Sequence, residues 1–149
     1  MKIAALIIAR AGSKRLPGKN NLDFEGLPVF AWNIKKAKKY FRAVYFSSDS
    51  EEMLKKAKAL GAIPIKRLSG LAADNVPNIP VFQHAYEFME SPDMIVSLQS
   101  NSPTLAETQI KRALAVMDIP DIQELVTIDR NFKVHGSIWA LKKDRLLNY

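Results

Sequence analysis

The residues best suited to chemistry in this chain lie in a basic, glycine-containing loop near the N-terminus. It runs from Arg10 to Asn20 and reads Arg-Ala-Gly-Ser-Lys-Arg-Leu-Pro-Gly-Lys-Asn. Gly12 and Gly18 let the backbone turn tightly or approach a ligand closely, while free loop N–H groups beside fixed positive charge attract phosphate. Residues 1–22 contain five lysines or arginines and no acidic residue, so nothing in that segment cancels the charge. The loop is therefore predicted to bind phosphate groups.

The glycine spacing excludes the two best-known phosphate-binding loops. A Walker A loop has four residues between its glycines, followed by Lys and Ser or Thr. Here Gly12 and Gly18 enclose five residues, and Asn20 stands where the metal-binding hydroxyl would be. The Gly-x-Gly-x-x-Gly pattern of dinucleotide-binding folds is also missing. For so short a motif taken alone, the alternative is a solvated basic loop that follows an N-terminal strand.

Composition narrows the class of protein. The chain has 149 residues, the size of one domain, and 48% of them are apolar. It has no cysteine and two histidines, which excludes disulfides, thiolate nucleophiles, zinc–sulfur sites and a histidine-rich metal site. No apolar run approaches the ~20 residues of a membrane span. With no signal-peptide pattern either, a cytoplasmic protein that binds no membrane is expected.

The net charge of +7 suggests an anionic partner, either nucleic acid or a small nucleotide. Many of the lysines fall between apolar positions at helical spacing, around residues 35–39 and 55–58. They are therefore expected on solvated helix faces, and no aromatic stacking platform accompanies them. Nucleic acid is the less favoured partner.

Alternating apolar patterns show which elements must position the loop. Strands are expected at residues 3–9, 43–47, 62–66, 94–98, 125–128 and 137–141. Helices are expected to start near Pro28, at a cap formed by Asp49 or Ser50, at Val81, and at a capping box that begins at Thr104. A polar, proline-rich loop is expected from Leu68 to Pro80.

This order predicts a single α/β domain over residues 1–149, a three-layer, doubly wound, mostly parallel sheet with helices on both faces. Ligands of such sheets bind beyond the carboxyl ends of the strands. The polar stretches that follow the first four strands should therefore converge at one rim. These stretches are Arg10–Asn20, Ser48–Asp49, Arg67–Asn78 and Gln99–Ser102.

Five stretches of the chain together resemble one family. The string at residues 9–20 is similar to the signature of cytidylyltransferases that activate acidic sugars, in particular the acylneuraminate cytidylyltransferases, or CMP-sialic acid synthetases. Val-Tyr-Phe-Ser-Ser-Asp at 44–49 and Leu-Gln-Ser-Asn-Ser-Pro at 98–103 resemble further family motifs. So do Arg67 with Leu-Ala-Ala-Asp-Asn at 71–75, and His-Gly-Ser-Ile-Trp at 135–139. The similarity covers nearly the whole chain.

The resemblance implies a nucleotide-diphospho-sugar transferase-like fold and transfer of CMP from CTP to an acidic sugar, with release of pyrophosphate and with Mg²⁺ bound to CTP. Arg10 and Lys19 would be the catalytic cations on the triphosphate. The resemblance implies nucleotide binding by Ala9, Arg10, Ala11, Gly12, Ser13, Lys14, Lys19, Asn20, Arg67 and Asn78, and sugar binding by Gln99, Ser102 and His135. Asp74 could equally be a helix or turn cap or a direct participant, and the alternative for Arg67 taken alone is a surface ion pair.

Three departures from the family pattern lead to further expectations. The resemblance implies a C-terminal Ile-Asp-Ile-Asp-Thr motif for Mg²⁺ and a dimerisation insertion between residues 128 and 135, and this sequence shows neither. The metal ligands are therefore unknown, and a monomer or weak dimer is expected. The arginine that the resemblance implies soon after Pro103 is also missing. A non-catalytic or partner-dependent nucleotide-binding homologue is accordingly the alternative to an active enzyme.

Overall fold

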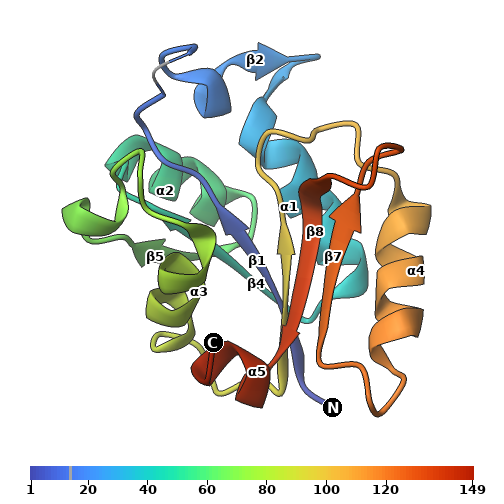
Figure 1. The fold of residues 1–149 in the computed structure, drawn as a ribbon. Helices are drawn as coiled ribbons and strands as arrows, with labels where there is room; N and C mark the ends of the chain where they lie inside the picture. The colour runs from blue at the N-terminus through green and yellow to red at the C-terminus, as the bar shows by residue number, and fades with distance from the viewer. Residues whose placement is uncertain (14) are drawn as a thin grey trace.

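The computed structural model describes residues 1–13 and 15–149, which alternate strands with helices around one central sheet (Figure 1). The strands are β1 (Ile3–Ile8), β2 (Asp23–Phe24), β3 (Leu27–Pro28), β4 (Ala43–Ser48), β5 (Ile63–Lys66), β6 (Met94–Leu98), β7 (Glu124–Ile128) and β8 (Val134–Lys142). The helices are α1 (Val29–Tyr40), α2 (Glu51–Ala59), α3 (Asn78–Tyr86), α4 (Glu107–Met117) and α5 (Lys143–Leu147). Two 3₁₀ turns, η1 (Lys19–Asn21) and η2 (Ser69–Leu71), lie in the loops.

The six-stranded sheet has the order β5-β4-β1-β6-β8-β7. Strands β1, β4, β5 and β6 run parallel, and β8 runs antiparallel to both of its neighbours. Within the sheet, Leu6 of β1 lies opposite Tyr45 of β4 and Ser97 of β6. The mostly parallel α/β sheet predicted from the alternating pattern is confirmed. The small β2–β3 hairpin and helix α5 were not predicted, because each is too short to show a periodic pattern.

Helices cover both faces of the sheet, which completes the predicted three layers. On one face, α1, α2 and α4 bury Phe30, Met53 and Ile110 in one hydrophobic cluster with the sheet. On the other face, α3 and α5 bury Phe82 and Leu146 in a second cluster. The central strands are apolar on both sides, as burial between two helical layers requires. The layers fix the strand ends, and therefore the loops that follow them, in space.

Two helix starts differ from the sequence prediction. Helix α3 begins at Asn78, inside the expected loop, because Pro80 lies in the first turn, where backbone N–H groups need no partner within the helix. Helix α4 begins at Glu107 and not at Thr104, and its first turn is closed by Gln109, whose side chain accepts a hydrogen bond from the Ala106 N–H at 3.1 Å. Of the two predicted caps of α2, Asp49 and Ser50, the structure shows Ser50, whose hydroxyl accepts the Met53 N–H.

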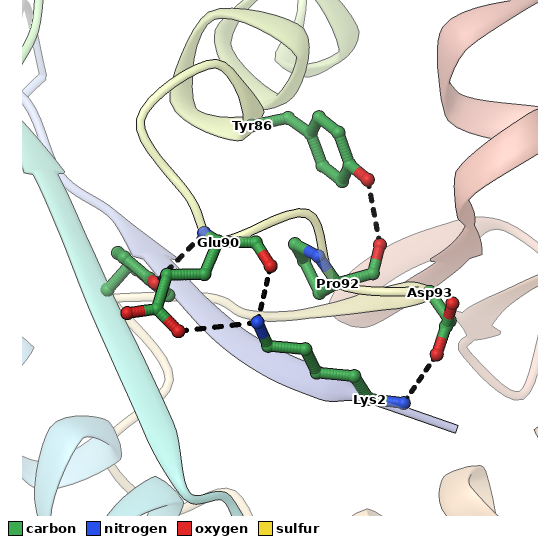
Figure 2. Close-up of polar contacts among 6 residues, drawn as sticks. Lys2, Tyr86, Glu90, Pro92 and Asp93 are labelled. Carbon is green, nitrogen blue, oxygen red and sulfur yellow. Dashed lines mark hydrogen bonds and ion pairs between the residues drawn. The ribbon is translucent and has the colours of Figure 1, made fainter.

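The amino end of the sheet is tied together by Lys2 (Figure 2). Its backbone N–H donates to the Asp93 carboxylate at 2.6 Å, and its ammonium group contacts the Glu90 carbonyl and carboxylate. Nearby, the Tyr86 hydroxyl donates to the Pro92 carbonyl at 2.8 Å. These contacts anchor the start of β1 and the turn before β6, so the loops at the opposite end of these two strands emerge side by side. Among the described residues, no helix is long and apolar enough to cross a membrane.

Candidate active site

A cavity of about 250 Å³, called here the rim cavity, opens at the carboxyl ends of the strands. Its walls come from three of the four polar stretches of the sequence that were expected to converge. The Ser48–Asp49 stretch does not line the cavity, but the Asp49 carboxylate accepts a hydrogen bond from the Ala11 N–H of the basic loop. The lining residues that the sequence had singled out are Arg10, Lys19, Asn20, Arg67, Asp74, Asn78 and Gln99. Three of these are cations and one is an anion. The convergence predicted from topology is confirmed for these residues.

The basic loop is held in place by backbone and side-chain contacts from the neighbouring loops. The Ala11 N–H donates to the Asp49 carboxylate at 2.8 Å, so the end of β4 fixes the start of the loop. Buried Asn20 donates to the Arg10 carbonyl at 3.2 Å and accepts from the Ser100 hydroxyl at 3.0 Å. Asn20 therefore joins both ends of the loop to the end of β6, which places Lys19 on the wall of the cavity.

Arg67 is a buried cation on this wall. It is 4% exposed, and its guanidinium donates to the Ser47 hydroxyl at 3.3 Å and the Ser47 carbonyl at 3.0 Å. Burial lowers the pKa of Arg67 to about 10, although nearby Asp49 opposes the shift, and Arg10 adds to it. The group stays charged at neutral pH. A desolvated cation is stabilised by an anion, so the burial of Arg67 favours an anionic ligand in the rim cavity.

A second, larger cavity of about 820 Å³ lies between α4 and the β7–β8 hairpin, and is called here the lateral cavity. The loop that follows β6 separates the two cavities, and Asn101 in this loop lines both. Gln99, on the rim side, accepts a hydrogen bond at 3.0 Å from the Ser102 hydroxyl, on the lateral side. Fully buried Asn33 of α1 holds this loop by donating to the Gln99 and Ser102 carbonyls at 2.7 and 3.0 Å.

The predicted site residues line several separate cavities. Ala9 lines the rim cavity, whereas Ala11 lies in a small crevice beside α2. Gly12 and Ser13 line an outer hollow that also contains Arg10 and Asp74. The predicted sugar-binding residues Ser102 and His135 line the lateral cavity, whereas Gln99 lines the rim cavity and contacts Ser102 through the hydrogen bond between their side chains. The prediction for Lys14 lies outside the described residues.

Sequence reasoning missed three residues that organise the site. Ser47 orients Arg67, Asn33 holds the loop between the cavities, and Ser100 binds Asn20. Ser47 and Ser100 stand in stretches whose importance the sequence does show, at strand ends. The sequence contained one indication of the role of Asn33. It is an amide on the apolar face of a helix, and a buried amide requires hydrogen-bond partners. Trp32 packs edge-on against Phe24, and its indole N–H donates to the Phe24 carbonyl at 2.8 Å, so Trp32 is a packing residue.

The described residues do not fit a protein-bound metal ion. Mg²⁺ is held by oxygen ligands, chiefly carboxylates, together with water and substrate phosphates. In residues 1–13 and 15–149, no group of three or more His, Cys, Asp or Glu side chains is arranged to hold a metal. Asp49 and Asp74, the acidic side chains nearest to the rim cavity, are already engaged with Ala11 and Arg10.

This geometry agrees with comparison to known proteins. A family model for cytidylyltransferases matches residues 4–136, which include every wall of the rim cavity. The chain belongs to the cytidylyltransferase family. Pseudaminic acid cytidylyltransferase of Campylobacter jejuni is 36% identical over 120 residues, 76% of this chain and 52% of that protein. N-acylneuraminate cytidylyltransferase of Oncorhynchus mykiss is 33% identical over 117 residues, 77% of this chain and 27% of that protein.

Solved cytidylyltransferase structures confirm the fold. A CMP:2-keto-3-deoxy-manno-octonic acid synthetase complexed with CTP superposes with a TM-score of 0.82 at 21% identity, covering 100% of this chain and 77% of that one. A cytidylyltransferase of Leptospira borgpetersenii gives 0.78 at 24% identity, covering 99% and 63%. This cytidylyltransferase chain spans 27% to 52% of the two curated relatives above. Family membership and fold are therefore shown, and the reaction has to be argued from the site.

Proposed function

We propose that this chain binds CTP in the rim cavity and transfers CMP to an acidic sugar. The observation that carries the proposal is the group of three cations, Arg10, Lys19 and buried Arg67, on the wall of one cavity at the carboxyl end of the sheet. A triphosphate carries the matching negative charge. The family relationship supports cytidine as the base and an acidic sugar as the acceptor.

In the proposed reaction, a sugar hydroxyl attacks the α-phosphate of CTP. The new sugar O–Pα bond forms as the bond from Pα to the bridging oxygen of the β-phosphate breaks. Pyrophosphate leaves with that electron pair, and the hydroxyl proton passes to water. Negative charge grows on the leaving pyrophosphate, and fixed cations stabilise such charge in the transition state. Arg10 and Lys19 supply these cations, while Arg67 and Asn78 hold the nucleotide, and Gln99 orients the acceptor.

The described ends of the basic loop suit this role because their backbone is fixed before the ligand arrives. Gly18 adopts a left-handed conformation with φ 66°, and the η1 turn follows directly with Lys19 as its first residue. Asn20 anchors the same turn to Arg10 and Ser100. Because the cations start close to their working positions, little ordering entropy is lost on binding. Gly12, Ser13 and Lys14 are proposed to contact the phosphates as well.

We propose that Mg²⁺ enters as a complex with CTP, because the described side chains do not form a metal site of their own. The same observation favours the second candidate function, a nucleotide-binding homologue that is catalytically incomplete by itself. Both candidates require CTP binding, and only the first requires turnover. A cytoplasmic location and the absence of nucleic-acid and membrane partners remain predictions.

The test measures binding and turnover separately. Calorimetric titration with CTP, ATP, GTP and UTP should show a preference for CTP. Release of pyrophosphate is then followed with CTP, Mg²⁺ and a panel of sialic, pseudaminic, legionaminic and 3-deoxy-octulosonic acids. Turnover with one acid supports the enzyme, and CTP binding without turnover supports the second candidate. No binding of CTP would reject both functions.

A further inference from the structure

A further cavity, of about 480 Å³, lies between the β2–β3 hairpin and the end of α2, and is called here the hairpin cavity. Its lining comes from η1, the hairpin and the last turn of α2, namely Asn21, Asp23, Leu27, Pro28, Lys56, Ala59 and Leu60. Among the described residues, none lines both this cavity and the rim cavity or the lateral cavity. The hairpin cavity is therefore separate from the proposed site of the reaction.

The walls of the hairpin cavity are mostly apolar. Leu27, Pro28, Ala59 and Leu60 supply aliphatic surface, and the two leucines also pack against the main hydrophobic cluster. Leu22, which stands between two lining residues in the sequence, is 44% exposed, so apolar surface continues outside the cavity. Apolar surface is stabilised when another apolar group covers it, by about 25 cal/mol per Å². The cavity is therefore suited to an apolar group that enters from solvent.

The charged residues in the described lining are engaged with other groups of the protein. The Lys56 ammonium group lies 2.8 Å from the Glu52 carboxylate and donates to the Asn21 side-chain oxygen at 2.9 Å. The Asp23 carboxylate accepts the Gly26 N–H at 3.3 Å, within the hairpin. These contacts hold the walls of the cavity together. Charge that could attract a ligand has to come from the border of the cavity.

Helix α1, which begins at the cavity, carries an excess of positive charge. Residues 29–42 contain five lysines or arginines and no acidic residue. Lys36 and Lys39 are engaged on the side of α4, where they contact the Pro103 carbonyl and the Glu107 carboxylate. The remaining charge of α1 is available on its other side.

Two lysines on that other side border the hairpin cavity. Lys38 donates to the Gly61 carbonyl at 3.3 Å, and Gly61 directly follows the lining residue Leu60. Lys35 stands three positions before Lys38, so both lie on the same edge of α1. Both are exposed, and in the described part of the chain neither forms an ion pair with a carboxylate. The apolar cavity therefore has a basic border.

An apolar hollow beside basic residues discriminates between classes of anionic partner. A membrane receives apolar side chains that project from a protein, whereas this apolar surface is concave. Single-stranded nucleic acid stacks its bases on aromatic side chains, and the described lining of the hairpin cavity contains none. A peptide can insert one apolar side chain into the hollow and place carboxylates beside the lysines, as the anchors of protein interfaces do. The combination therefore favours an acidic peptide.

We propose that the hairpin cavity is a docking site for an acidic segment of a partner protein. One large apolar side chain of the segment fills the cavity, and neighbouring carboxylates pair with Lys35 and Lys38. The rim and lateral cavities stay open when the partner is bound. The partner also contacts Asn21, the last residue of the η1 turn that begins with Lys19, so it docks directly beside the basic loop. This inference does not depend on the proposed reaction.

The experiment selects binders from a phage-displayed library of random peptides on the immobilised full chain. Enriched peptides are synthesised and titrated by calorimetry into wild type and variants, whose folding is checked by thermal unfolding. Ala59→Trp fills the mouth of the cavity, and Ala115→Trp on the exposed face of α4 is its matched control. Ala59→Glu, which repels an acidic segment, repeats the test if the tryptophan variant does not fold. Enriched peptides should combine a large apolar residue with acidic residues, and Ala59→Trp should weaken them at least tenfold.

A second set of variants tests the basic border. Changing Lys35 and Lys38 together to Gln should weaken the peptides about threefold to tenfold, as expected for exposed ion pairs. The same double change at exposed Lys111 and Lys143 should leave the affinity unchanged, although it alters the net charge equally. Lys19→Gln should also have no effect, because Lys19 lines the rim cavity and not the hairpin cavity.

Several results would overturn the proposal. These are a selection that enriches no peptide, enriched peptides without acidic residues, and equal affinity of wild type and Ala59→Trp. A loss confined to Lys19→Gln would place the peptide in the rim cavity and overturn the proposal as well. Phosphatidylserine vesicles and a single-stranded oligonucleotide are tested in parallel. Binding of either one, lost when Lys35 and Lys38 are changed, would replace the peptide by that class of partner if no peptide is enriched.

Discussion

Arg10 and Asp74 form an ion pair where the rim cavity meets the outer hollow, although they are 64 positions apart in the chain. Their side chains are 30% and 32% exposed, so solvent reaches both partners. The carboxylate of Asp74 thus occupies a position on Arg10 that a phosphate oxygen would take. The sequence left a helix or turn cap and direct participation open for Asp74, and the ion pair places its carboxylate beside the cations of the rim cavity.

This pairing predicts competition between Asp74 and CTP. In Asp74→Asn, the guanidinium of Arg10 no longer has to exchange a carboxylate for phosphate, and one negative charge is removed from the cavity. CTP affinity measured by calorimetry should rise about threefold to tenfold, in line with the ~1 kcal/mol of a partly exposed ion pair. Asp121→Asn, at the opposite end of the sheet, is the matched control. Weaker CTP binding in Asp74→Asn would mean that the carboxylate assists the nucleotide.

The cations of the basic loop should contribute directly to binding. Arg10→Ala and Lys19→Ala should each weaken CTP binding by roughly 1–3 kcal/mol, the usual loss for a charged hydrogen bond. Lys58→Ala on the exposed face of α2 controls for the change in net charge. Unchanged affinities in both loop variants would contradict the proposed phosphate site, whereas equal losses in all three variants would indicate a nonspecific charge effect.

Asn33 is predicted to link stability to the site. Its amide nitrogen donates to two carbonyls of the loop after β6, and it is fully buried. Asn33→Ala should lower the free energy of unfolding by about 1–3 kcal/mol, because two partly buried carbonyl acceptors lose their donor. Urea denaturation measures this loss, with Asn148→Ala near the C-terminus as the control. A variant of unchanged stability would show that water replaces the amide without cost.

Glu124 is expected to give stability a pH dependence. Burial raises the pKa of its carboxyl, but hydrogen bonds from Arg145 and Trp139 lower it by more, so the pKa lies below its ordinary value of 4.5. A carboxyl with a depressed folded pKa stabilises the fold above the unfolded pKa, and this stability is lost as pH falls through the folded pKa. Glu124→Gln should therefore lower the free energy of unfolding at pH 7 by about 1–2 kcal/mol.

The difference between wild type and Glu124→Gln should shrink below pH 4.5 and vanish in stronger acid. Denaturant unfolding at a series of pH values, followed by far-UV circular dichroism, tests this. Glu87→Gln on the exposed end of α3 is a control that should show no such trend. A difference independent of pH would mean that packing, and not charge, explains the effect.

Oligomeric state is a further prediction. Strands β7 and β8 are joined by only five residues, 129–133, so the connection is too short for a separate dimerisation element. Sedimentation velocity at micromolar protein should show a monomer or a weak dimer. A tight dimer would be inconsistent with this expectation and would direct attention to exposed Phe132 and Val134 beside the turn.

Local patterns in the sequence were sufficient for the fold class and for the position of the rim cavity. Apolar runs identified β1, β4 and β6, and alternation with amphipathic helices implied a parallel sheet, whose strands carry their ligand loops at one end. The sequence alone therefore predicted that Arg10, Lys19 and Arg67 lie close together. The basic loop was visible as well, because uncancelled charge beside glycines is a property of neighbouring residues.

Only the tertiary structure decided how these residues are used. Two contacts join positions more than 60 residues apart, which no local pattern encodes. They are the Arg10–Asp74 ion pair and the hydrogen bond from Asn33 to the loop after β6. The division of Gln99 from Ser102 and His135 into two cavities depends on how that loop crosses the rim. Side chains acquire partners through packing, and packing depends on every layer of the fold at once.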